Sequence, residues 1–298
     1  AFKTEFLVKF VVLLFIFSFV LLAIVPIIGI EVKGAKRWID FYFFRLQPIE
    51  ILKPFFILMT AKLLTFEKFE HSQVKYIFSF MLLGSIVILL VNQPDLGQSI
   101  LLIGSWVGTV FISGVSLIYI FVIFLIFSIL LSTLLFFLPE KFGYIINRLI
   151  TFFDPDQGDK FQSSNALDAI KLGGLTGKGM GEGILKDSVP EAHTDYVIAV
   201  ISEEYGSIVS IIILIIFLYI SFRIIKNCFN QDNQFLKISL SGLATLLIFQ
   251  TFIHAGVNTN LLPTTGMTLP FLSYGGSSII SISILSGTIL NLTKRKIS

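Results

Sequence analysis

Charged residues and cysteine are both scarce in this chain of 298 residues. Charged residues make up only 14% of the sequence, against about 25% in soluble domains, whereas 55% are hydrophobic and the mean hydropathy is +0.89. One cysteine, Cys228, excludes an internal disulfide, and the three histidines form neither an HExxH pair nor a cluster with cysteine: His71, His193 and His254. The sequence therefore excludes a soluble enzyme, a secreted disulfide scaffold and a structural zinc protein.

The basic residues give no sign of a nucleic-acid partner. The net charge is only +3, and the 22 lysines and arginines lie between apolar runs without forming a stripe. What the chain has in abundance is long apolar runs, and most of its phenylalanines lie in them. These runs indicate that the protein lives in a lipid bilayer.

Eight apolar segments predict an all-α integral membrane protein, a polytopic helical bundle. Each is close to the length that crosses about 30 Å of hydrocarbon as a helix, and they lie at about 10–30, 47–66, 76–92, 96–116, 117–138, 196–222, 238–262 and 269–292. The second segment carries Glu50, Lys53 and Lys62, so an interfacial amphipathic helix is the alternative there. The chain starts without methionine and enters the first span at once, and we expect it to be a fragment.

Charge placement predicts which side of the membrane each connection faces. If the helices alternate in direction, the short connections on one side of the membrane hold most of the lysines and arginines that set orientation, and such connections face the cytoplasm. The long hydrophilic loop at 139–195 is on the opposite side and therefore lies outside. Five basic residues then crowd one short outer connection: Lys33, Lys36, Arg37, Arg45 and Lys53. Either an anionic ligand at the outer surface or anionic lipid head groups would favour them there.

Two polar groups in the first half of the chain are candidate site residues, because ionisable side chains near spanning helices are costly. In residues 34–53, Trp38 is either an interface anchor or a ligand contact, and Glu50 and Lys53 lie three residues apart on one helix face. In residues 93–98, Asp95 is a candidate site residue, although we favour a role as the N-cap of the next span.

The third polar group is residues 190–195, directly before the span that starts at Tyr196. Asp195 at the mouth of this span could accept a proton from a sugar hydroxyl, whereas the structural alternative makes Thr194 or Asp195 a helix N-cap. On one continuous helix Glu203 would lie roughly 80° from Asp195 and Glu204 roughly 180°. We therefore expect Glu203 to face the cavity and Glu204 to pair with a neighbouring helix.

The fourth polar group is a helix pair joined by a connector rich in proline and glycine, at residues 258–266 and 269–278. Non-helical backbone at membrane depth is tolerated where it lines a cavity. The glycine-rich segment (residues 171–183) is not a nucleotide loop, because GxxxGK is one residue short of the Walker spacing and Gly179 follows the lysine.

Taken together, these groups resemble the RodA/FtsW (SEDS) family of membrane glycosyltransferases over nearly the whole chain. The resemblance rests on GAKRWID with QPIE, NQPDLGQ, the G-x-G-E-G segment, PEAHTDYVIAVISEEYG and NLLPTTGMTLPFLSYGGSS, the last of which is closer to the division branch than to the elongation branch. Ile49 stands where the family usually has a small residue, and Tyr196 where it usually has phenylalanine. Family members have ten helices, so the resemblance implies that the first two are absent from this single SEDS-type domain.

The resemblance implies an inverting peptidoglycan glycosyltransferase that polymerises lipid II at the outer face of the bacterial cytoplasmic membrane. It matches Asp195 to the catalytic carboxylate, and Arg37, Arg45 or Lys53 would take up charge on the pyrophosphate. A class B penicillin-binding protein, divisome or elongasome proteins and membrane lipid are the implied partners; no metal ligand is assigned, and a divalent cation is left open. The expected substrate-binding residues are Lys36, Arg37, Trp38, Arg45, Gln47, Glu50, Lys53, Asp95, His193, Thr194, Glu203, Asn258, Ser273 and Tyr274.

Two functions of other classes stay open at this point. A lipid II flippase would also use broken helices and intramembrane carboxylates, but it needs a polar path across the whole membrane. A scaffold that only recruits a penicillin-binding protein would use the polar motifs for helix packing and would leave the outer cationic residues without a purpose.

Overall fold

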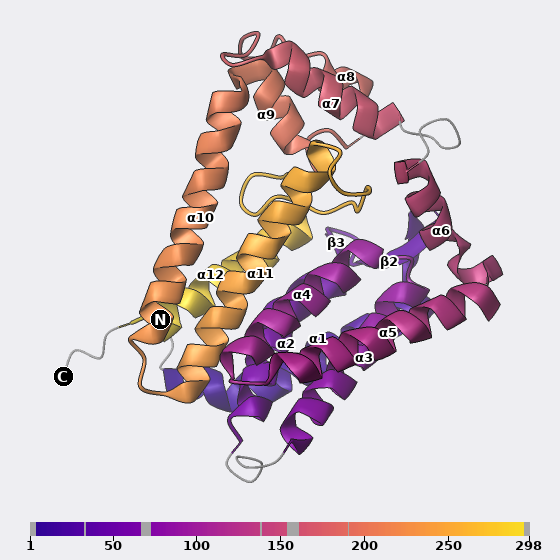
Figure 1. The fold of residues 1–298 in the computed structure, drawn as a ribbon. Coiled ribbons are helices and arrows are strands. Elements are labelled where there is room, and N and C mark those ends of the chain that lie inside the picture. The colour runs from indigo at the N-terminus through magenta and orange to yellow at the C-terminus, as the bar shows by residue number, and fades with distance from the viewer. Residues whose placement is uncertain are drawn as a thin grey trace. The chain divides into compact units, whose positions relative to one another are not determined.

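A computed structural model describes residues 4–32, 34–66, 73–137, 139–153, 161–189 and 191–294. The chain divides into two compact units. The first comprises residues 1–115, 220–249 and 275–298, and the second comprises residues 116–219 and 250–274. Figure 1 gives the order of the elements along the chain.

The first unit is built around α2, which packs against α1, α3, α4 and α12. Because α2 has neighbours on several sides, most of its length is buried, including the charged residues Glu50 and Lys53. The bounds of these helices are Thr4–Ile28 for α1, Pro48–Leu64 for α2, Val74–Asn92 for α3, Leu96–Ile112 for α4 and Gly276–Leu292 for α12.

A small antiparallel sheet joins α1 to α2, so the expectation of an all-α fold is wrong at residues 30–46. Its strands are β1 (Ile30–Val32), β2 (Ala35–Asp40) and β3 (Arg45–Leu46), in the order β1-β2-β3. The chain between α1 and α2 is too short for another helix, and pairing of these strands satisfies its backbone hydrogen bonds. Four exposed aromatic residues, 41–44, form the turn between β2 and β3.

The second unit contains the segment 139–195, which we expected to be one long loop. Three helices lie in it: α6 (Pro139–Phe153), α7 (Phe161–Gly173) and α8 (Leu185–Ser188). Both α7 and α8 pack against the short helix α9 (Val197–Tyr205), as Figure 1 shows. The unit also contains α5 (Leu117–Phe137), and it shares α10 (Ser207–Phe229) and α11 (Gln234–Asn258) with the first unit.

The predicted spans correspond to helices, with two important differences in length. Among the described residues, four helical stretches are long and apolar enough to cross a membrane: Val8–Ile28, Val74–Asn92, Ser207–Phe229 and Gln234–Asn258. The helices α2, α4 and α12 are shorter, at 17 residues each. The predicted span 196–222 is broken between α9 and α10, and the predicted span 269–292 is helical only from Gly276.

Gly206 is the residue at the break between α9 and α10. Its φ of +89° lies in the region that favours glycine, and a Cβ there would lie 2.1 Å from the carbonyl oxygen of Leu175. The tight approach of the Leu175 backbone therefore requires glycine, and the chain changes direction there instead of continuing the helix.

Candidate functional site

Asp195 lies at the end of a turn that precedes α9, here called the Asp195 turn (residues 191–195). Its backbone N–H donates to the carbonyl of Glu191 at 3.0 Å, and its side chain is half-buried. Tyr196 occupies the N-cap position of α9 and makes no side-chain cap. The alternative that Thr194 or Asp195 is the N-cap is therefore wrong, and the carboxylate of Asp195 is not used to start the helix.

The side chain of Asn258 holds the Asp195 turn from the end of α11. Its Nδ2 donates to the backbone carbonyls of Asp195 and His254, both at 2.9 Å, and its Oδ1 accepts the N–H of Ala199 at 3.0 Å. Asn258 is fully buried, so these bonds are not exchanged with water. Asn258 thus acts on the backbone around Asp195, where the sequence analysis expected it to bind substrate.

A non-helical connector (residues 259–275) contacts the other side of the Asp195 turn. The Oγ of Ser273 donates to the carbonyl of Thr194 at 2.6 Å, and the N–H of Tyr274 donates to the carbonyl of His193 at 3.0 Å. A Cβ on Gly266 would lie 3.5 Å from Oδ2 of Asp195, so the connector passes beside the carboxylate. The structure therefore brings together the third and fourth polar groups that the sequence singled out.

Helix α11 fixes the connector in turn. His254 makes a 2.7 Å hydrogen bond through Nδ1 with the carbonyl of Met267, and Nε2 of Gln250 donates to the carbonyl of Thr268 at 2.9 Å. Both side chains are buried. The sequence analysis did not include Gln250 or His254 among the site residues, although a buried polar side chain one or two turns before Asn258 was a usable signal.

Tyr196 is buried directly next to Asp195. Burial, together with the neighbouring Asp195 and Glu191 carboxylates, raises the pKa of Tyr196 to about 12. The phenol therefore stays protonated near neutral pH, and Asp195 is the group in this pair that can accept a proton.

The expectation that Glu203 faces a cavity is wrong. Its side chain is 1% exposed, and its two carboxylate oxygens accept the N–H groups of Ile184 and Leu185, both at 3.0 Å. Nζ of Lys178 lies 3.4 Å from Oε1. The reason is that the backbone at the start of α8 lies against Glu203 and binds its carboxylate, where helix geometry alone predicted a cavity.

The glycine-rich segment completes the contact with the end of α9. The N–H groups of Lys178 and Gly179 donate to the carbonyls of Glu203 and Glu204, and a Cβ on Gly177 would lie 2.2 Å from the carbonyl oxygen of Glu204. Oε1 of Glu204 lies 3.2 Å from Nζ of Lys186, so Glu204 pairs with the neighbouring helix α8, as predicted. The glycines of this segment therefore permit close backbone packing.

A buried polar cluster lies in the first unit around Glu50. Its Oε1 is 2.9 Å from Nζ of Lys53 and accepts Nε2 of Gln98 at 2.8 Å, and its backbone carbonyl accepts the Oγ of Ser281. Lys53 is only 1% exposed. The expectation that Lys53 takes up charge on a pyrophosphate at the outer surface is wrong, because this ammonium is buried and paired inside the helix bundle.

Asp95 caps α4, as the favoured interpretation predicted. Its Oδ1 accepts the N–H of Gln98 at 3.3 Å, and its Oδ2 accepts Nε2 of Gln47 at 3.1 Å. Arg37 donates to the backbone carbonyls of the same turn, from Nε to Gln93 at 2.9 Å and from Nη2 to Pro94. Arg37 therefore holds the β2 strand to the start of α4.

Three further residues expected to bind substrate lie on the small sheet. Lys36 is exposed, Trp38 is half-buried opposite Ile30 on β1, and Arg45 is exposed with Nε 3.6 Å from Oδ2 of Asp40. Within the described ranges, no three histidine, cysteine, aspartate or glutamate side chains gather into a metal site. Lys36 and Arg45 remain accessible cations on the sheet.

The fold and the site together define a mostly helical, multi-pass membrane protein. The cell cycle protein family of FtsW, RodA and SpoVE matches residues 1–297, and the chain belongs to this family. It is 34% identical over 271 residues to the probable peptidoglycan glycosyltransferase FtsW of Caulobacter vibrioides, covering 91% of this chain and 68% of that protein.

Solved structures show the same fold. The chain is similar to a solved structure described as the structural coordination of polymerization and crosslinking by a peptidoglycan synthase complex. The TM-score is 0.80 and the identity is 26%, and the match covers 98% of this chain and 82% of that chain. A crystal structure of a variant of the rod shape determining protein RodA of Thermus thermophilus matches with a TM-score of 0.71, 25% identity, and coverage of 100% and 82%.

Proposed function

We propose that this protein is a peptidoglycan glycosyltransferase that polymerises lipid II at the outer face of the bacterial cytoplasmic membrane, together with a class B penicillin-binding protein. The observation that carries the proposal is the Asp195 turn. A half-buried carboxylate lies there on a turn whose backbone carbonyls accept hydrogen bonds from the side chains of Asn258 and Ser273, and Tyr196 takes the N-cap position of α9. The names of the relatives support the same reaction class.

In the proposed reaction, Asp195 acts as the general base. The 4-hydroxyl oxygen of the acceptor GlcNAc attacks the anomeric carbon of the donor sugar, and the bond from that carbon to the pyrophosphate oxygen breaks with inversion. The hydroxyl proton goes to the Asp195 carboxylate, and the polyprenyl pyrophosphate leaves with the bonding electrons. The rigid backbone around Asp195 supports this role, because a base must be held within hydrogen-bond reach of the proton that it takes.

Lys36 and Arg45 are the residues of the small sheet that we propose to bind an anionic group of the substrate. Both side chains are exposed on the small sheet, whereas Lys53 is paired with Glu50 and Arg37 is engaged with two backbone carbonyls. An accessible arginine or lysine can bind a phosphate oxygen without first breaking a buried ion pair.

The proposal is tested by polymer formation from purified lipid II, with the full-length protein and its penicillin-binding partner. We expect Asp195→Asn to lower the rate of polymerisation by at least about 100-fold, since general-base catalysis contributes about 10²–10⁴. The matched control is Glu191→Gln, which changes an exposed carboxylate in the same turn and should keep the parent rate. Equal rates for Asp195→Asn and the parent, at equal melting temperature, would show that Asp195 is not the base.

The same preparation separates the two alternative functions. Movement of labelled lipid II across liposomes that persists in Asp195→Asn, without polymer, would indicate a flippase. Normal assembly with the penicillin-binding protein and full cell-wall synthesis by Asp195→Asn would indicate a scaffold.

A further inference from the structure

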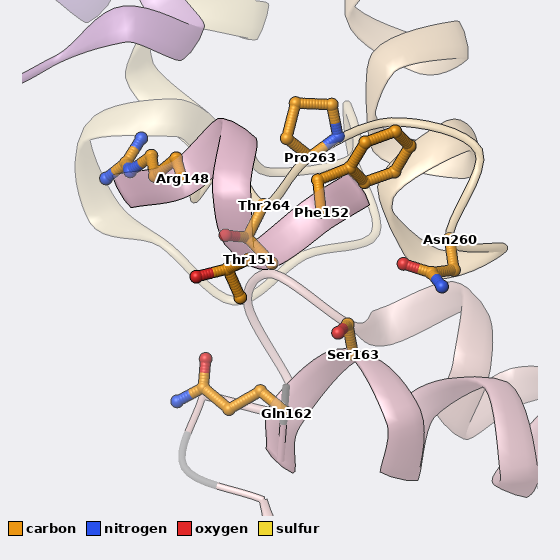
Figure 2. Close-up of a pocket in the computed structure, with 8 residues that line it drawn as sticks. All are labelled: Arg148, Thr151, Phe152, Gln162, Ser163, Asn260, Pro263 and Thr264. Carbon is orange, nitrogen blue, oxygen red and sulfur yellow. The ribbon is translucent and has the colours of Figure 1, made fainter. Parts of the chain in front are cut away.

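A pocket of about 210 Å³ lies in the second unit, between α6, α7 and the connector. Figure 2 shows its eight lining side chains, which come from three segments far apart in the sequence. They are Arg148, Thr151, Phe152, Gln162, Ser163, Asn260, Pro263 and Thr264. The sequence pointed to the connector residues only as part of the fourth polar group, and no motif contained the residues from α6 and α7.

The chemistry of the lining indicates the class of ligand. Five neutral side chains can donate or accept hydrogen bonds, and one arginine, one aromatic ring and one proline ring complete the wall. Among the described residues no carboxylate lines the pocket, so a metal cation is not favoured there, and a single arginine gives little attraction for a polyanion. Hydroxyl, amide and ring surfaces together suit a saccharide, whose ring has polar edges and apolar faces.

The size of the pocket narrows the ligand further. Pockets for drug-sized ligands enclose about 300–1,000 Å³, and this pocket is smaller at about 210 Å³. It therefore has room for about one sugar ring with its substituents.

The pocket is connected to the Asp195 turn through the connector. Thr264 in the pocket wall is two residues before Gly266, and two residues span at most about 7 Å. Gly266 passes beside Oδ2 of Asp195, since a Cβ there would lie 3.5 Å from that oxygen. One short stretch of the connector thus lines the pocket at Thr264 and passes beside the carboxylate of Asp195 at Gly266.

We propose that this pocket is a saccharide subsite that binds a sugar of the growing glycan strand next to the sugar that reacts at Asp195. The biological role of this subsite rests on the proposed function, because it requires that the protein polymerises a glycan strand. Binding of one further sugar would keep the strand attached between successive couplings, so that the subsite controls the length of the product.

The test compares Gln162→Ala with Lys171→Ala in the full-length protein with its penicillin-binding partner. Gln162 lines the pocket, whereas Lys171 lies on the same helix with an exposed side chain that pairs with the exposed Asp168. When strands are compared after equal amounts of lipid II have been consumed, we expect those of Gln162→Ala to be at least threefold shorter than those of the parent. Lys171→Ala should give strands of the parent length, and both variants should melt at the parent temperature.

A second measurement does not depend on catalysis. Purified, undecorated glycan oligomers of GlcNAc and MurNAc are titrated onto Asp195→Asn, with and without Gln162→Ala, and we expect the second change to weaken binding at least fivefold. Parent strand length and parent oligomer affinity in Gln162→Ala would overturn the subsite while leaving the proposed function intact. Absence of polymer from the parent would overturn the proposed function, and the oligomer titration alone would then decide whether the pocket binds saccharide.

Discussion

Asn258 holds Asp195 by its backbone: Nδ2 of Asn258 lies 2.9 Å from the carbonyl oxygen of Asp195. The same side chain accepts the N–H of Ala199 in the first turn of α9. One buried amide thus fixes both the turn that carries the carboxylate and the helix that follows it. Asn258 is a positioning residue in the proposed reaction, because its side chain bonds the backbone of Asp195.

We expect Asn258→Ala to lower the turnover number for polymerisation at least tenfold. The change removes the hydrogen bonds that Asn258 makes to the backbone of Asp195 and Ala199, at a cost of about 1–3 kcal/mol in the free energy of unfolding. A KM for lipid II close to that of the parent would show that the variant still binds lipid II and has lost the correct position of Asp195. Thr259→Ala, next in the chain and exposed, is the control and should match the parent. An unchanged turnover number in Asn258→Ala would contradict the positioning role.

Glu203→Gln and Glu204→Gln should differ in stability. Glu203 is buried and accepts two backbone N–H groups, whereas Glu204 is more exposed and pairs with one lysine. An amide in place of the Glu203 carboxylate brings an NH₂ donor to one of the two backbone donors, so Glu203→Gln should lower the melting temperature clearly more than Glu204→Gln. Thermal melting of both variants in detergent decides this, and the opposite order would refute the assignment.

The Glu203 carboxylate also predicts a pH dependence. Burial raises its pKa, but the N–H groups of Ile184 and Leu185 and the charge of Lys178 outweigh burial and hold the pKa below its ordinary value of 4.5. A folded-state pKa below the unfolded one stabilises the protein above about pH 4.5, and this stabilisation is lost as the pH falls through the lowered value. Melting temperatures measured from pH 7 down to pH 3 should therefore fall less steeply in Glu203→Gln than in the parent.

Gly177→Ala and Gly174→Ala form a matched pair in the glycine-rich segment. Both glycines have a positive φ, +80° and +58°, so both variants carry a similar backbone strain of about 1–2 kcal/mol. Only at position 177 would the new Cβ also meet backbone, 2.2 Å from the carbonyl oxygen of Glu204. Gly177→Ala should therefore give the lower melting temperature, and equal melting of the two variants would show that the packing against α9 is not tight.

Lys53→Met should destabilise the first unit because it leaves the buried Glu50 carboxylate without its cation. Removal of one partner of a buried ion pair costs about 3–5 kcal/mol, whereas replacement of both partners is often neutral. The double variant Glu50→Gln with Lys53→Met should therefore recover most of the stability, since glutamine can still accept from Gln98. If Lys53→Met alone polymerised poorly at full stability, a direct role for Lys53 in binding would have to be reconsidered.

Local features of this protein could be predicted from the sequence, and distant contacts could not. The cap formed by Asp95 was predictable because its partner, the N–H of Gln98, lies three residues away. Most helices were predictable because an apolar run of about 20 residues is typical of a helix that spans a membrane. The proximity of Asp195 to the connector was not predicted, since no local pattern links residue 195 to residues 258–273.

Two of the incorrect interpretations share a physical cause. Glu203 was placed towards a cavity by helix geometry alone, but the backbone of Ile184 and Leu185, which lies much earlier in the chain, binds its carboxylate. Lys53 was assigned to the surface by charge alone, and its burial depends on Gln98 and Ser281, which hold Glu50 from two other helices. In both cases the deciding partner lies far away in the sequence.

The contacts of Glu203 also set an order of events during synthesis. Its bonds to Ile184, Leu185 and Lys178 close over only 19, 18 and 25 residues, whereas Asn258 and Ser273 reach the Asp195 turn over 63 and 79 residues. Short loops close early and long ones late, so α7, α8 and α9 can assemble while α11 is still unmade. We expect nascent chains that have emerged as far as residue 229 to protect the glycine-rich segment from protease, and to protect the Asp195 turn only once residues 258–273 have emerged. The packing of α7 and α8 on α9 would thus form before Asn258 and Ser273 hold the Asp195 turn in place.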